Sequence, residues 1–292
     1  MQSYVLVALL AAFIHAFSSV YSKRLYVLAD HPAQVAFYSL FSTGLLCGVL
    51  VPFIRFSDPS GAWLDVLGAG GCFALGYVTL LMAIRIGDAS FVVPLIGLKI
   101  FFIAGLSALF LAETYGPLVY AGGIGAMVGM FLLGDGRLNG NPRALALMLF
   151  TTFCYALTDI FLVRLFRAGF GTLEVMVYLF VVSALLLVPF AVRTLKGRYR
   201  VNRRFAGGLL MYGAVQLLGG VFLMLSFALA KVATMVNIVQ SARGLFAVGV
   251  VWLITRVGLE GMERLSRRQY VMRACGAALM TLSITAAIVA NR

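Results

Sequence analysis

Long apolar runs fill this chain from one end to the other, and they constrain its fold more than any other feature. Ten runs are each about 20 residues long, which is the length a helix needs to cross the hydrocarbon core of a bilayer. They cover residues 3–22, 33–54, 62–85, 88–111, 116–134, 143–166, 172–194, 205–230, 233–255 and 270–290. Such runs are about twice as long as barrel strands, and an open sheet cannot satisfy its backbone in lipid. The sequence therefore predicts an all-α integral membrane protein with ten transmembrane helices.

Composition supports a membrane protein. The chain is 62% hydrophobic and only 11% charged, which leaves too little polar surface to cover a soluble globule of 292 residues. Its net charge of +13 would suggest nucleic acid binding in a soluble protein. In a membrane protein, the first explanation of this positive charge is topology, because basic residues collect in cytoplasmic loops. We therefore expect the lipid bilayer, and no nucleic acid, as a partner. An anionic substrate remains the second explanation.

Few residues offer catalytic or metal chemistry. The four cysteines, Cys47, Cys72, Cys154 and Cys275, lie inside apolar runs without CxxC spacing, as buried small hydrophobes do. Only two histidines are present, and no nucleotide-binding, hydrolase or metalloprotease motif occurs. We expect no catalytic residue, metal or cofactor. The first run lacks a basic leading segment, so it does not resemble a cleaved signal peptide.

The two halves of the chain repeat. A shift of 140 residues aligns His15 with Tyr155 and Tyr38 with Tyr178, and a shift of 144 aligns Lys99 with Arg243. This predicts a duplication into residues 1–138 and 139–292, each with five helices. Because five is an odd number, the halves must be inverted relative to each other. Inverted repeats are common in secondary transporters, whose substrate sites lie near the midplane between the halves.

Several short stretches resemble a known family. They are residues 83–90 (AIRIGDAS), residues 109–113 (LFLAE), and residues 261–266 (GMERLS) before a Gly-rich last run. With these the chain resembles the drug/metabolite transporter superfamily in its EamA-type form, which implies ten helices in two five-helix repeats and a transport function. One departure is that residues 231–234 read KVAT where residues 87–90 read GDAS. The resemblance also implies cytoplasmic termini.

Basic residues lie unevenly on the two sides of the predicted membrane. Lys99 and Arg243 lie within runs, which leaves 21 of the 23. Sixteen lie on one side, namely Lys23, Arg24, Arg85, Arg137, Arg143, Arg193, Lys196, Arg198, Arg200, Arg203, Arg204, Arg256, Arg264, Arg267, Arg268 and Arg273. Five lie on the side of both termini, namely Arg55, Arg164, Arg167, Lys231 and Arg292. Because basic residues collect in cytoplasmic loops, this count predicts termini outside the cytoplasm, against the family expectation.

Lys99 and Arg243 are the leading candidates for substrate contact. A cation in the middle of a membrane helix costs roughly 2.5–3.5 kcal/mol, so it usually faces a wet cavity and marks function. The two also occupy equivalent positions of the repeat. They could hold a phosphate or carboxylate, with Arg243 binding it through two donors and Lys99 acting as a point charge. The alternative is internal pairing, for which Asp159 is the obvious counter-ion.

Other polar and aromatic residues could line the same cavity. Tyr155 and Asp159 share a polar helix face, and His15 lies on the matching face of the first run. Gln240, three residues before Arg243, shares its face, whereas Asn237 is turned further away. Hydrogen bonding between helices is the alternative role for these residues. The remaining candidates are Gln216, Tyr38, Tyr77 and Tyr178, of which the tyrosines could stack on a substrate or simply pack.

Together these features predict a secondary transporter of a bacterial inner membrane. It would move a small organic, anionic metabolite by alternating access. One alternative is a flippase for a lipid-linked phosphosugar or another anionic lipid, where the same cations would meet a phosphate. A second alternative is a non-transporting receptor or assembly protein, and an intramembrane enzyme is least supported. The Gly-rich segment 122–129 is typical of close helix packing, within the fold or in a homodimer.

Overall fold

The computed structural model describes residues 3–110, 141–230, 233–257 and 266–289, with isolated positions between 118 and 132. Within these ranges the chain is helical and forms no strand, which confirms the all-α prediction. Seven helical segments there are long and apolar enough to cross a membrane. They are Tyr4–Leu28, Pro32–Phe53, Trp63–Ile86, Ala89–Leu106, Pro142–Arg167, Thr172–Leu195 and Arg203–Ala230. Apart from those isolated positions, the run predicted at 116–134, which includes the Gly-rich segment 122–129, lies outside the described residues.

The helices of the first half are α1 (Ser3–Leu28), α2 (Pro32–Gly48), η1 (Val51–Phe53), α3 (Trp63–Ile86), α4 (Ala89–Val92), η2 (Val93–Leu98) and α5 (Lys99–Phe110). Those that follow are α7 (Pro142–Arg167), α8 (Thr172–Val177), η3 (Tyr178–Val182), α9 (Ser183–Leu195), α10 (Arg203–Ala230), α11 (Ala233–Gln240), α12 (Arg243–Val257) and α13 (Arg267–Val289). Of the short elements, η1 and η2 are 3₁₀ turns and η3 is one π-helical turn. The predicted runs 88–111 and 233–255 are therefore each interrupted rather than continuous.

Local sequence explains where the helices begin. His31 caps α2 by accepting a hydrogen bond from the Ala33 backbone N–H, and Pro32 occupies the first turn. Asn141 caps α7 in the same way through the Arg143 backbone N–H, with Pro142 following. An oxygen or nitrogen acceptor at the cap satisfies an N–H that has no intrahelical partner, and proline suits the first turn. The residues that mark turns in the sequence, His31-Pro32 and Asn141-Pro142, thus form the N-terminal caps and first turns of α2 and α7.

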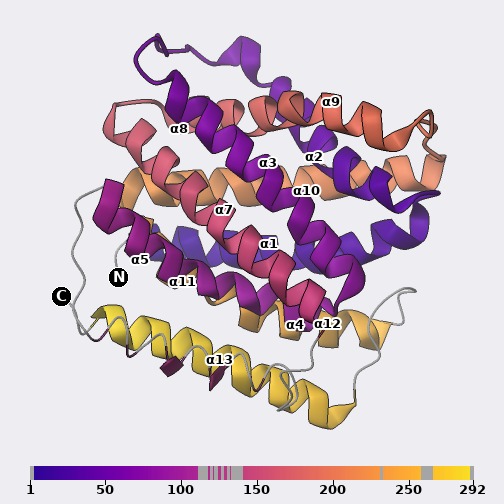
Figure 1. Cartoon of the computed structure of the whole chain (residues 1–292), viewed down its shortest axis with the longest axis vertical. Helices are drawn as coiled ribbons and strands as arrows, with labels where there is room; N and C mark the ends of the chain where they lie inside the picture. Colours follow the sequence, from indigo (N-terminus) through magenta and orange to yellow (C-terminus); the bar gives the residue numbers. More distant parts are fainter. Residues whose placement is uncertain are drawn as a thin grey trace.

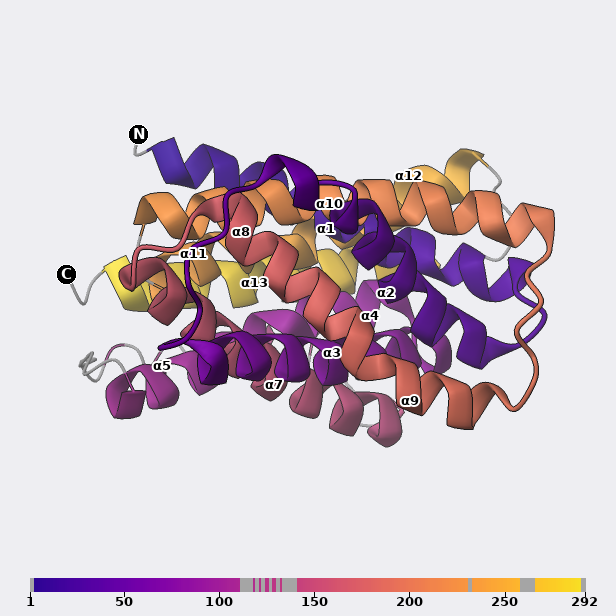
Figure 2. The same cartoon turned by 90° about the horizontal axis from the view of Figure 1, so that it is seen from above.

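Helices from the two halves of the sequence pack against each other. The most extensive contacts join α3 to α7 and α1 to α10 (Figures 1 and 2). Figure 1 places α13 along one margin of the molecule. The first turn of α1 and the last turn of α13 lie at the same end in both views. Exposed Leu and Phe side chains, such as Leu64 and Phe53, cover the outside, as expected where a helix meets lipid.

Candidate functional site

A cavity lies between α1, α3, α7, α10 and the two interrupted helices. Its polar lining consists of His15, Ser19, Tyr77, Lys99, Tyr155, Thr158, Asp159, Tyr212, Gln216, Asn237, Gln240, Ser241 and Arg243. Apolar groups such as Phe73, Ile84 and Phe180 complete the wall. The free volume is about 60 Å³, which has room for a few water molecules but not for a metabolite. The helices around the cavity are therefore drawn together in this structure.

Both mid-membrane cations lie at breaks in helices. Lys99 is the first residue of α5, directly after the 3₁₀ turn η2, and Arg243 is the first residue of α12. Pro94 lies in the first break and lacks the N–H that a continuous helix would use. The two breaks lie in close contact. A Cβ added to Gly244, in the second break, would lie 2.9 Å from the Cα of Pro94, in the first. The positive N-termini of half-helices of this kind favour anionic groups.

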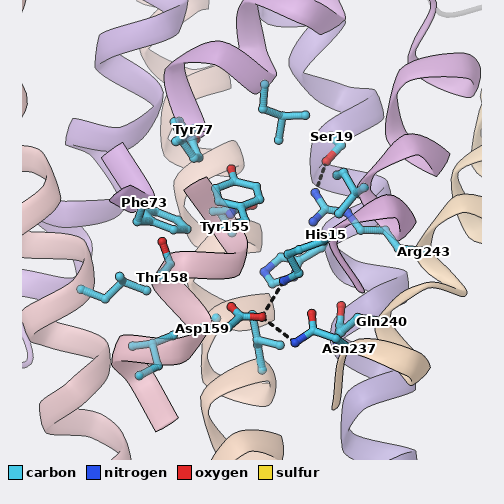
Figure 3. A pocket seen from close by; sticks show the side chains of 18 of the residues that line it. His15, Ser19, Phe73, Tyr77, Tyr155, Thr158, Asp159, Asn237, Gln240 and Arg243 are labelled. Carbon is cyan, nitrogen blue, oxygen red and sulfur yellow. Dashed lines mark hydrogen bonds and ion pairs between the residues drawn. The ribbon is translucent and has the colours of Figure 1, made fainter. Parts of the chain in front are cut away.

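Lys99 has a counter-ion. Its Nζ lies 2.7 Å from Oδ2 of Asp159, and the side chains of both residues are largely buried. The Asn237 amide donates a second hydrogen bond to the same oxygen, at 2.5 Å. Figure 3 shows Asp159 turned toward Asn237, and the two hydrogen bonds hold the carboxylate from α5 and α11. Lys99 thus adopts the internal pairing that the sequence left open.

Arg243 is differently placed. One of its terminal nitrogens donates to the hydroxyl of Ser19, a neutral group (Figure 3). Its Nε is buried and has no hydrogen-bond partner among the described residues. None of the carboxylates within the described ranges forms an ion pair with it. Arg243 therefore presents a positive charge and an unused donor at the cavity.

His15 also points an unpartnered nitrogen at the cavity. The residue is 4% exposed, and its Nε2 has no hydrogen-bond partner in the described part of the chain. Figure 3 places its ring between Asp159 and Arg243. On α10, Gly219 makes room for it, since a Cβ there would lie 2.6 Å from the imidazole Cδ2. Nε2 could contact a bound molecule without breaking an existing hydrogen bond.

Aromatic side chains form another part of the wall. The rings of Phe73 and Tyr155 stack with centroids 5.6 Å apart and planes at 25°. The hydroxyl of Tyr77 donates to the hydroxyl of Tyr212 at 2.8 Å. Stacked rings beside a cation provide both an apolar surface and a charged anchor.

Eight of the ten sequence candidates line the cavity. They are His15, Tyr77, Lys99, Tyr155, Asp159, Gln216, Gln240 and Arg243. Two of them are also used between helices, because Gln216 accepts from the Ser18 hydroxyl at 2.8 Å and Gln240 donates to the Ala8 carbonyl at 2.8 Å.

Tyr38 and Tyr178 lie away from the cavity and pack elsewhere, which is the alternative role that the sequence left open for the tyrosines. The hydroxyl of Tyr38 donates to the Tyr199 carbonyl at the α9–α10 loop. The ring of Tyr178 packs near Phe56 and Phe170. Repeat equivalence alone placed these tyrosines together, and it does not say which face of a helix meets the cavity.

The sequence undervalued Asn237 and missed Phe73 and Tyr212. On one continuous helix, Asn237 would be turned further away from Arg243 than Gln240 is. Because α11 ends at Gln240 and α12 starts at Arg243, helical spacing does not predict which way Asn237 points relative to Arg243. Tyr212 lies four residues before Gln216 on α10, so helical spacing could have identified it. Phe73 carries no polar signal.

Among the described residues, no group of three His, Cys, Asp or Glu side chains lies close enough to hold a metal ion. Lys99 and Asp159, which line the cavity, pair with each other. The described lining offers charge, hydrogen bonds and aromatic surfaces to a bound molecule.

Comparisons with known proteins agree with the helical architecture. A solved structure described only as "Crystal structure of protein" is similar to this chain, with a TM-score of 0.64 and 16% identity over 100% of this chain and 99% of its own. At that identity the likeness shows the fold alone. No curated protein matches the sequence. Residues 2–134 match the model of the EamA-like transporter family. This family belongs to the drug/metabolite transporter superfamily, which the sequence motifs resemble.

Proposed function

We propose that the protein is a secondary transporter that moves a small organic anion by alternating access. The match of residues 2–134 to the EamA-like transporter family supports the transport function, and Arg243 carries the proposal about charge. A mid-membrane cation costs roughly 2.5–3.5 kcal/mol, so an unneutralised one needs a functional reason. Arg243 lines the cavity, has a buried donor without a partner among the described residues, and makes its described hydrogen bond to a neutral hydroxyl. A carboxylate or phosphate on the substrate would satisfy both its charge and its free donor.

The other cavity residues have supporting roles in this proposal. Lys99 is neutralised by Asp159 and shapes the local field rather than serving as an equal partner of Arg243. His15 offers its free Nε2 to a polar group of the substrate. Phe73 and Tyr155 contact the apolar part of the molecule.

Alternating access requires two bodies that move relative to each other. We assign them to the proposed inverted repeats, residues 1–138 and 139–292. Equivalent helices of these halves carry Lys99 and Arg243 at their breaks, which supports the assignment. The cavity of about 60 Å³ is too small for a metabolite, so substrate entry needs the helices around it to separate.

We place the protein in the inner membrane of a bacterium, with the lipid bilayer as its surroundings. The uneven distribution of basic residues supports termini outside the cytoplasm. The dense basic hairpin 193–204 would then meet anionic lipid headgroups on the cytoplasmic side.

The test replaces Arg243 with Gln and with Lys in purified protein. Anionic metabolites should raise the melting temperature of the wild type more than zwitterions or cations of similar size. R243Q should weaken anion binding about tenfold to a hundredfold, because a hydrogen bond to a charged group contributes about 1.5–3 kcal/mol. R243K keeps the charge but loses the planar fork, so it should bind with intermediate affinity.

The matched control is R198Q, which removes an arginine from the exposed α9–α10 hairpin. It should leave anion binding and uptake into proteoliposomes unchanged. Equal anion binding and uptake in wild type and R243Q would rule out the proposed anion site.

A further inference from the structure

We infer that the cavity accepts a substrate group with a single negative charge, and that Asp159 sets this valence. The inference rests on the proposed function, since it concerns the same anion site. It goes further by naming monoanions as the substrate class and Asp159 as the residue that determines specificity.

The charges that line the cavity give the first argument. Among the described lining residues, three carry a formal charge at pH 7 with histidine counted as neutral: Lys99, Asp159 and Arg243. Lys99 and Asp159 form an ion pair at 2.7 Å, so their charges cancel. One positive charge remains, on Arg243. A substrate with one negative charge makes the occupied cavity neutral, which low-dielectric surroundings strongly favour.

The hydrogen bonds around Asp159 give the second argument. Its Oδ2 accepts from both Lys99 and Asn237, so the carboxylate is fixed on the Lys99 side of the cavity. Arg243 instead donates to Ser19. A first anionic group can therefore bind Arg243 without disturbing the ion pair. Among the described lining residues, a second one could reach a cation only by displacing Asp159 from Lys99, and a buried carboxylate left without its partner is strongly unfavourable.

This arrangement predicts what each variant will prefer. D159N keeps the shape of the side chain but frees the charge of Lys99, so the cavity gains a second positive charge and should accept dianions. K99Q leaves Asp159 opposed only to Arg243, so the cavity becomes neutral and should lose its preference for anions. The double variant K99Q/D159N again has one net positive charge, and the preference for monoanions should return.

The experiment uses three probes of nearly equal size and different charge. They are monomethyl terephthalate (one negative charge), terephthalate (two) and terephthalamide (none), each built on a ring that suits the wall of Phe73 and Tyr155. Affinities are measured by calorimetry on the full-length protein in detergent. The wild type should bind the monoester about tenfold or more tightly than either other probe, and D159N should shift the ratio of dianion to monoanion affinity about tenfold or more toward terephthalate.

The matched control is D65N, which frees Arg164 from a 3.1 Å ion pair outside the cavity. It should leave the ratio of affinities unchanged. If D159N does not fold, the ratio of dianion to monoanion affinity in the wild type and in K99Q/D159N still tests the inference. Equal affinity of the wild type for monoester and terephthalate, or an unchanged ratio in folded D159N, would overturn the inference.

Failure of this inference is distinguishable from failure of the proposed function. If the wild type binds both anions equally but still prefers them to terephthalamide in an Arg243-dependent way, the anion site stands and only the valence rule falls. If neither anion binds better than terephthalamide, both fall.

Discussion

At the scale of single residues, the two cations at the helix breaks differ in their partners. Lys99 is paired with a carboxylate, whereas Arg243 contacts a hydroxyl and keeps its Nε free of any partner among the described residues. His15 lies beside them because one glycine on α10 leaves space for its ring. The position of a cavity side chain thus depends on the size of a residue on the neighbouring helix.

We therefore expect G219A to displace His15. The new methyl group would lie 2.6 Å from Cδ2 and 2.7 Å from Nε2 of the imidazole, well inside van der Waals contact. Overpacking of this kind typically lowers the free energy of unfolding by about 1–3 kcal/mol. G207A is the control on the same helix, where no heavy atom lies within 4 Å of the new Cβ. It should be neutral or slightly stabilising. Equal melting temperatures for the two variants would contradict this packing.

At the scale of elements, the two interrupted helices define the site. Each break places a cation of the cavity at the start of a helix, where a continuous helix would have carried it along one face. Pro94 interrupts the first helix, and Gly244 lies against it from the second. The close approach of the two breaks depends on the absence of a side chain at position 244.

G244A should consequently separate the two breaks. The added methyl would lie 2.9 Å from the Cα of Pro94, and a backbone atom cannot rotate away as a side chain can. We expect about 1–3 kcal/mol less stability and weaker anion binding, because Arg243 is the adjacent residue. G249A on the same helix is the control, since nothing lies within 4 Å of its new Cβ. Melting temperature and anion affinity, measured together, test this. If G244A binds anions as tightly as G249A does, the close approach of the two breaks is not needed for anion binding.

At the scale of the whole molecule, polar contacts join the two halves at both ends of α3. At its end, the buried Arg273 of α13 lies 2.7 Å from Asp88, while Lys23, from the same half as Asp88, lies 3.8 Å from this carboxylate. Near its start, Asp65 pairs with Arg164 at 3.1 Å. A transport cycle in which one end opens at a time would have to break these contacts in turn.

The orientation of the whole molecule in the membrane can be measured directly. Sixteen basic residues against five predict termini outside the cytoplasm, since lysine and arginine are retained on the cytoplasmic side. A reporter fused to the C-terminus and active only outside the cytoplasm should therefore be active. A second fusion in the basic hairpin 193–204 should be inactive and serves as the control. The reverse pattern would show that the family expectation of cytoplasmic termini is right.

The long apolar runs are enough to predict a helical, membrane-spanning chain. Runs of about 20 apolar residues have no other stable arrangement in lipid, because every backbone group must be paired within the segment. The sequence also identified Lys99, Arg243, His15 and Asp159 as unusual, since a polar or charged side chain at membrane depth is costly wherever it lies.

The partners of these residues, in contrast, depend on how the helices pack. Asp159 neutralises Lys99 rather than Arg243 because α7 and α11 bring the carboxylate and Asn237 to the same side of the cavity. Tyr38 and Tyr178 are excluded because their helix faces meet other helices and loops. The charge of a side chain follows from its residue type. Which group serves as its counter-ion depends on the distance between segments far apart in the sequence, and packing sets that distance.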